Sequence, residues 1–292
     1  MPTFDTPDPI SVTLEIGVGD IRITASDRSD TVVEVRPSDG ARKADVDVAE
    51  QTRVELAAGR LLIRAPRGWR YFGPWGGSGS IDVEIALPAG SHVSADAGMG
   101  PVHTLGRLGE CRCKTGFGDV AIEHATTIRL HSGGGDISVD RAEGFGEVST
   151  GTGTVRIGEV DGGAAIRNSN GATWVGVTGG DLRVKAANGA IDVDHALASV
   201  DARSANGGVR VAEVVHGRVV AETAAGRVEI GVREGVAAYL DLDTKYGSVR
   251  NDLDAVAGPE PDAETVEVRA RTGFGDIVIH RSFARDTLRE EA

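Results

Sequence analysis

A glycine-anchored phrase recurs along this chain at an almost fixed period, and it constrains the fold more than any other feature. We define the anchor as the glycine two residues before the first aliphatic residue of each copy. From residue 100 onward the anchors are Gly100, Gly118, Gly135, Gly153, Gly171, Gly189, Gly207, Gly226, Gly247 and Gly275. Their numbers rise in steps of 18, 17, 18, 18, 18, 18, 19, 21 and 28. Such a period indicates a repeat architecture in which each copy is one structural unit.

Each copy carries two alternating runs of aliphatic residues, which is the pattern of β-strands. The first run lies two and four positions after the anchor, as in Val155 and Ile157. The second run follows about half a period later, as in Ile128 and Leu130. Two strands and two turns leave no room for a crossover helix. We therefore predict an all-β fold, a parallel β-solenoid (β-helix) with about 18 residues and two short strands per coil, in which equivalent residues stack at about 4.8 Å. The general handedness of parallel connections favours a right-handed coil.

The N-terminal part repeats the same phrase less regularly. Earlier copies at Gly19, Gly59 and Gly79 precede the next anchor by steps of 40, 20 and 21. We therefore divide the chain into looser, irregular N-terminal β coils at residues 1–95, with an aromatic loop at 67–79, a regular β-solenoid at 96–280, and a C-terminal tail or cap at 281–292.

Three asparagines share one phase of the repeat. Asn170, Asn188 and Asn206 each precede an anchor and are separated by one full period of the repeat. Stacked coils would bring their amides into register, so that they hydrogen-bond from coil to coil. The alternative is three independent Asn-Gly turns, which explains the residue type but not the shared phase.

The chain resembles a known bacterial family on three features: the anchored phrase, the paired short strands, and the lead-in through the segments 10–16 (Ile-Ser-Val-Thr-Leu-Glu-Ile) and 19–23 (Gly-Asp-Ile-Arg-Ile). This is the β-strand-repeat family of "putative adhesins", domain of unknown function 4097. The resemblance covers about residues 10–280. It implies a β-solenoid and a role in surface interaction, and it supplies no catalytic residue.

Charge and hydropathy exclude several function classes. The 292 residues include 31 Lys or Arg and 44 Asp or Glu, which gives a net charge of -13 and argues against nucleic acid as a partner. The N-terminus carries acid and proline where a signal peptide needs a basic start and an apolar run. No apolar run is long enough to span a bilayer, so we expect no membrane span and a cytoplasmic protein.

No motif points to a metal, a cofactor or catalysis. The stretch from Gly133 to Asp136 resembles a calcium-binding β-roll, but the period is about twice too long and no carboxylate ladder follows. Cys111 and Cys113 share the phase of interior aliphatic residues, so we expect them to be buried and reduced rather than zinc ligands. No cluster of serine, histidine and acid stands out. We predict that the chain is not an enzyme and binds no cofactor.

The most irregular segment concentrates aromatic and basic side chains between glycines and proline. Such side chains carry much of the binding energy at protein interfaces. The predicted partner-binding residues are Arg67, Trp69, Arg70, Tyr71, Phe72 and Trp75. The alternative is that the loop folds back over an edge of the solenoid. Trp174 falls between two inward positions, so we expect it to be a lone aromatic side chain on the surface.

These observations favour a non-enzymatic interaction or scaffold protein, an adhesin-like rod that binds another protein or a surface polymer. Two alternatives remain open. One is a self-assembling solenoid filament, in which the ends of the rod associate. The other is a carbohydrate-binding or carbohydrate-active β-helix protein that uses the aromatic loop.

Overall fold

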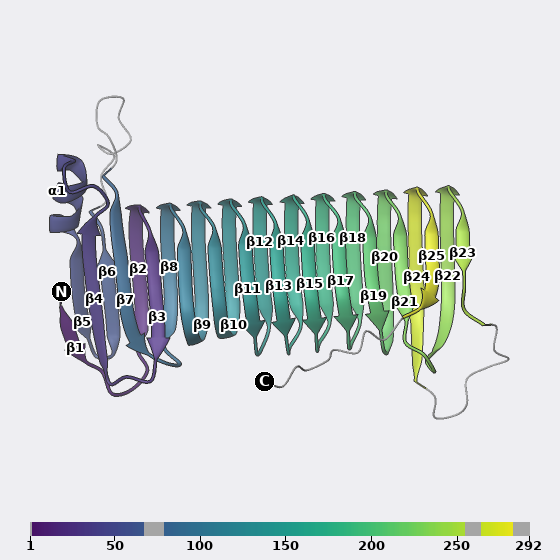
Figure 1. Ribbon diagram of the computed structural model, residues 1–292, viewed down its shortest axis with the longest axis horizontal. Helices are drawn as coiled ribbons and strands as arrows, with labels where there is room; N and C mark the ends of the chain where they lie inside the picture. The colour runs from purple at the N-terminus through teal and green to yellow at the C-terminus, as the bar shows by residue number, and fades with distance from the viewer. Residues whose placement is uncertain (1, 67–78, 255–263, 283–292) are drawn as a thin grey trace, which may run out of the picture.

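The computed structural model describes residues 2–66, 79–254 and 264–282. They form a nearly closed parallel β-solenoid, a rod whose coils stack along one axis (Figure 1). The predicted fold class is confirmed.

The described elements are 25 strands and one short helix. In chain order they are β1 (Thr3–Asp5), β2 (Ser11–Val18), β3 (Ile21–Ser26), β4 (Asp30–Pro37), α1 (Lys43–Gln51), β5 (Arg53–Ala57), β6 (Arg60–Arg64), β7 (Ile81–Pro88), β8 (His92–Met99), β9 (Val102–Phe117), β10 (Val120–Gly134), β11 (Ile137–Ala142), β12 (Gly146–Thr152), β13 (Val155–Val160), β14 (Ala164–Asn170), β15 (Thr173–Thr178), β16 (Leu182–Asn188), β17 (Ile191–Ala196), β18 (Val200–Asn206), β19 (Val209–Val214), β20 (Gly217–Ala225), β21 (Val228–Val232), β22 (Ala237–Tyr246), β23 (Val249–Asn251), β24 (Thr265–Phe274) and β25 (Ile277–Arg281).

Each strand of the rod body pairs in parallel with the equivalent strand of the next coil. The register follows the repeat, so that Val155 lies beside Thr173, and Thr173 lies beside Ile191. We call the strands that follow an anchor glycine the downstream sheet and those that precede it the upstream sheet. The upstream sheet contains β8, residues 110–117 of β9, residues 127–134 of β10, and then β12, β14, β16 and β18.

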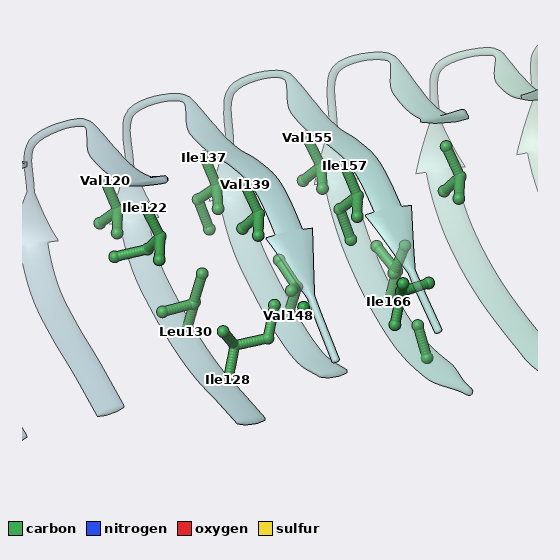
Figure 2. Packing of buried hydrophobic residues seen from close by; sticks show 14 of the residues in the cluster. Val120, Ile122, Ile128, Leu130, Ile137, Val139, Val148, Val155, Ile157 and Ile166 are labelled. Atoms are coloured by element: carbon green, nitrogen blue, oxygen red, sulfur yellow. The ribbon is translucent and has the colours of Figure 1, made fainter. Parts of the chain in front are cut away.

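The core lies between the two sheets. Aliphatic side chains from both sheets point into it and repeat from coil to coil (Figure 2). The six side chains predicted to face inward are at most 1% exposed: Val155, Ile157, Ile191, Val193, Val209 and Val211. Cys111 and Cys113 are also buried and free, as predicted, with their Sγ atoms 3.7 Å apart.

The anchor glycines form a tight corner column. At Gly189, φ is +150°, and a Cβ atom would overlap the carbonyl oxygen of Gly171 in the neighbouring coil. A ladder of interior hydroxyl groups, which we did not predict, satisfies the corner carbonyls. The Ser204 hydroxyl donates to the carbonyl of Gly189 at 3.1 Å, and the Thr223 hydroxyl donates to that of Gly207 at 2.9 Å. The corner therefore requires glycine, and most coils place a small polar residue opposite it, whereas Ala97 and Ala186 take that register position in two coils.

The predicted asparagine ladder is present. The Asn188 amide donates to Oδ1 of Asn170 at 2.9 Å, and the Asn206 amide donates to Oδ1 of Asn188 at 2.9 Å. The shared phase of the three residues therefore reflects contact between coils and not only a turn preference.

The coils at both ends do not follow chain order. The coil of β24 and β25 lies between the coil of β20 and β21 and that of β22 and β23. In the same way, the coil of β2 and β3 lies between β6 and β7 on one side and β8 and β9 on the other. Chain order predicted that Gly226 would stack on Gly247, but it stacks on Gly275. Both ends of the chain thus supply a coil that is hydrogen-bonded on two sides.

Antiparallel strands cover the N-terminal end of the rod. β5 pairs with β6, and β4 pairs with β7 and β1. Gly59 lies in the hairpin turn between β5 and β6, and Gly79 packs against the backbone of Ala44 in α1. Of the three early copies of the phrase, only Gly19 forms a corner.

Candidate functional site

The predicted partner-binding residues, Arg67, Trp69, Arg70, Tyr71, Phe72 and Trp75, lie outside the described residues. Their role in binding stays a prediction. The structure does describe the two chain segments that carry this loop, 60–66 and 79–88.

The first stem is tied to the adjacent strand β2. The Arg64 guanidinium donates two hydrogen bonds to the Glu15 carboxylate, at 3.0 and 3.2 Å. The backbone N–H of Ala65 donates to the carbonyl of Glu15 at 2.9 Å, and the Ala65 side chain is buried. Hydrogen bonds to β2 therefore fix the chain that leads into the loop up to residue 65.

A buried carboxylate in α1 holds the second stem. Asp45 is 2% exposed, and its Oδ1 accepts the backbone N–H of Ser80 at 3.0 Å. Its other oxygen accepts the N–H of Asp39 at 3.2 Å, and the Arg42 guanidinium lies 3.6 Å away. A buried carboxylate needs such partners. The helix thus holds the point at which the chain leaves the loop.

A column of basic side chains runs along the outer surface of the upstream sheet. We call it the basic column: Lys114, His131, Ser149, Arg167, Lys185 and Arg203, which are direct neighbours on six successive coils. Asp96 precedes it and Glu222 follows it in the same register. The parallel column beside it adds Arg112, Arg129 and Arg183.

Ion pairs neutralise this surface only in part. Arg112 and Arg129 share Glu110, at 2.9 and 3.6 Å. Arg167 lies 3.8 Å from Glu147. The remaining arginines of the two columns also pair with acids: Arg183 and Arg203 with Asp201, and Arg203 also with Glu222. Among the described residues, Lys114 and Lys185 form no ion pair.

The sequence contained a signal for this surface that we did not use. Positions 114, 131, 149, 167, 185 and 203 follow one another in steps of 17, 18, 18, 18 and 18. The repeat aligns outward side chains as strictly as inward ones.

The downstream sheet carries Trp174, which lies on the outer surface as expected and also contacts two charged side chains there. Its indole N–H donates to Asp194 at 3.1 Å, and the Arg156 guanidinium lies over its ring, 4.8 Å from the centroid. Gly176 leaves room for the ring on the same strand. Burial raises the pKa of the neighbouring Asp192. Because these contacts occupy the indole, we interpret Trp174 as part of the surface packing.

Three histidines face glutamates. His280 Nε2 lies 3.4 Å from Glu229, and the other two histidines stand in clusters that do not have the arrangement of a catalytic triad. His124 and Arg107 both contact Glu143, and the Arg107 hydrogen bonds lower the pKa of Glu143 to about 2.

In the second cluster, Glu213 lies between the hydroxyl of Ser282, at 2.8 Å, and His195, at 3.6 Å. A triad requires histidine between the hydroxyl and the acid. This geometry does not activate the serine.

The aspartates near the corner have a structural role. Asp119 Oδ1 accepts the backbone N–H of Asp136 at 2.8 Å, and Asp136 Oδ1 accepts that of Thr154 at 2.6 Å. Across the described ranges, no group of three potential ligand side chains comes together in a way that would hold a metal ion. Within the same residues, no helix is long and apolar enough to cross a bilayer.

Solved structures with low sequence identity align along nearly the whole chain. A "putative adhesin" from Parabacteroides distasonis is 14% identical, with 95% of both chains covered and a TM-score of 0.47. A "putative adhesin" from Bacteroides fragilis is also 14% identical, with 95% of both chains covered and a TM-score of 0.39. A "putative lipid binding protein" from Parabacteroides distasonis is 13% identical, with 95% of both chains covered and a TM-score of 0.36.

No curated protein matches the chain. The Toastrack family, domain of unknown function 4097, matches residues 9–285. This match spans the described coils from β2 to β25 and agrees with their repeating two-strand pattern. The chain therefore belongs to the Toastrack family.

Proposed function

We propose that this chain is a non-enzymatic interaction protein, a rigid acidic rod that presents the aromatic segment to another macromolecule. The observation that carries this proposal is the fixed base of the segment. Glu15 and Asp45 hold its two stems through hydrogen bonds to Arg64 and Ser80. A binding loop on a rigid scaffold loses less conformational entropy when it captures a partner.

The composition of the segment supports the same role. Tryptophan, tyrosine and arginine dominate interface hot spots, and the segment holds Trp69, Tyr71, Trp75 and two arginines within nine residues. The contacts of Trp174 to Arg156 and Asp194 leave that indole less available as an alternative anchor.

Crosslinking and affinity capture from the native cell test this proposal. The double variant W69A/W75A should lose its specific cross-linked partner and keep the thermal stability of the wild type. The matched control is F145A/Y239A, which removes two other aromatic side chains that are 54% and 58% exposed. Capture that is undiminished in W69A/W75A would place the site elsewhere, and loss of folding would support the edge-cover interpretation.

Self-association is a second candidate, and one observation restricts its form. β4, β5 and α1 cover the N-terminal end, while no described strand pairs with the outer edge of β22. Leu240 and Leu242 on β22 are only partly buried, whereas their equivalents in inner coils are buried. An unpaired apolar edge favours strand addition.

If the rods associate through this edge of β22, two of them would meet at their C-terminal ends and form a closed dimer. Light scattering should then show a limiting mass of two chains at high concentration. Growth beyond two chains would instead support the filament.

A further inference from the structure

We propose that the basic column binds an acidic polysaccharide, a linear sugar polymer with a carboxylate or sulfate group on successive units, laid along the rod axis. This deepens the proposed binding function by naming a class of partner. It uses residues other than those of the aromatic segment, so variants of each site distinguish the two ideas.

The charge of the column is opposite to that of the whole chain. The net charge is -13, yet between Asp96 and Glu222 the column carries no acid and presents Lys114, His131 and Arg167 among its members. Local potential rather than net charge guides an extended anion to a surface. The nearby ion pairs are exposed and add little stability, so a polyanion can compete for these cations.

The spacing of the column favours a sugar polymer over an acidic peptide. Successive positions lie on neighbouring parallel strands, about 4.8 Å apart. An extended peptide presents side chains on one side only about every 6.7 Å, so its acids would fall out of step within a few coils. A sugar unit is close in length to one coil, so the polymer stays in step with the coils, and acidic groups on its inner face can meet Lys114, Arg167, Lys185 or Arg203.

An open groove lies on this part of the surface. It has a volume of about 480 Å³ and is lined by Lys114, Arg129, His131, Ser149 and Arg167, with the acids Asp96 and Glu147 also in its wall. Ser149, the smallest side chain of the column, lies between His131 and Arg167 and lines this groove. Its hydroxyl can pair with sugar hydroxyl groups, while the surrounding cations face the acidic groups.

The same surface lacks what two other anionic partners need. The outward positions of the basic column and of the column of Arg112, Arg129 and Arg183 carry no Phe, Tyr or Trp. Single-stranded nucleic acids bind largely by stacking bases on aromatic rings. Peripheral binding to a bilayer combines cations with large apolar side chains that insert, and between Lys114 and Arg203 the only apolar residue of these two columns is the small Ala165.

Titration of the full chain with sodium alginate, with neutral dextran as the control, tests the proposal. The variant R167E/K185E reverses two charges of the column. Its matched control R210E/R250E makes the same change in net charge on the downstream sheet, at Arg210 on β19 and Arg250 on β23. We expect the wild type to bind alginate and not dextran. Its affinity for alginate should fall as salt is added.

The affinity of R167E/K185E for alginate should fall about tenfold or more, and that of R210E/R250E should stay within about twofold. W69A/W75A should bind alginate as the wild type does. The proposal is overturned if alginate does not bind at low salt, if the two charge variants lose affinity equally, or if W69A/W75A loses it. Tighter binding to duplex DNA or to phosphatidylglycerol vesicles than to alginate would also overturn it, because it would assign the column to another class of partner.

Discussion

Replacing Gly189 with alanine should strongly destabilise the solenoid. The new Cβ would overlap the carbonyl oxygen of Gly171 and lie 2.6 Å from its carbonyl carbon. Both atoms belong to a backbone that is hydrogen-bonded from coil to coil, so neither can move away easily. Alanine would also have to adopt φ of +150°. Backbone strain and overpacking together suggest a loss of about 3–5 kcal/mol in the free energy of unfolding.

Thermal unfolding followed by circular dichroism measures this effect. For a domain of this size we expect the midpoint to fall by about 10 °C. Gly17→Ala is the matched control, because Gly17 is exposed on β2 and a Cβ there meets no atom within 4 Å. An unchanged midpoint for Gly189→Ala, or an equal fall for both variants, would refute the close stacking of the corners.

Three further predictions concern the core and one surface cluster. The variant Ile191→Asp places an unpaired charge at a position that is 0% exposed, so it should not fold stably. Circular dichroism would show this loss, and a normal unfolding midpoint would contradict the core assignment. Cys111 and Cys113 are both buried, and the hydrogen bond with Cys113 and burial raise the pKa of the Cys111 thiol. Maleimide should therefore label neither cysteine until the chain unfolds, and fast native labelling would contradict this. Arg107 holds the pKa of Glu143 at about 2, so the ionised carboxylate stabilises the fold above its unfolded pKa, and this stability is lost as the pH falls toward 2. The difference in melting temperature between wild type and E143Q should therefore shrink below about pH 4.5, and a constant difference would contradict the assignment.

The sequence predicted the solenoid because each regular coil carries its own copy of the anchored phrase, which specifies the strand positions locally. The positions of Val155, Ile191 and Val209 follow from the glycine anchor alone. The order of the end coils could not be read in this way, since nearly identical coils can stack on one another in several orders. The anchored phrase is absent from residues 233–236 and from the sequence between β23 and β24, so it gives no order for the coils that these segments connect.

The candidate sites were less predictable for a different reason. An aromatic cluster such as Trp69 to Trp75 is visible in sequence, but its neighbours depend on how the chain folds around it. The hydrogen bond from the Ser80 backbone N–H to the Asp45 carboxylate joins two distant parts of the chain, so no local sequence pattern predicts it. The basic column had a signal in its phase. We missed it because polar residues are usually compared by composition rather than by register.

Spin labels on the upstream sheet test the stacking of the coils most directly. Glu222 is a direct neighbour of Arg271, which in turn neighbours Asp243 on the last coil. Cysteines at 222 and 271 should bring two labels onto adjacent strands about 4.8 Å apart and give strong spin exchange, while labels at 222 and 243 should be separated by a further coil. The buried Cys111 and Cys113 should not react under native conditions. Strong exchange for 222 and 243, with weak exchange for 222 and 271, would contradict the inserted terminal coil.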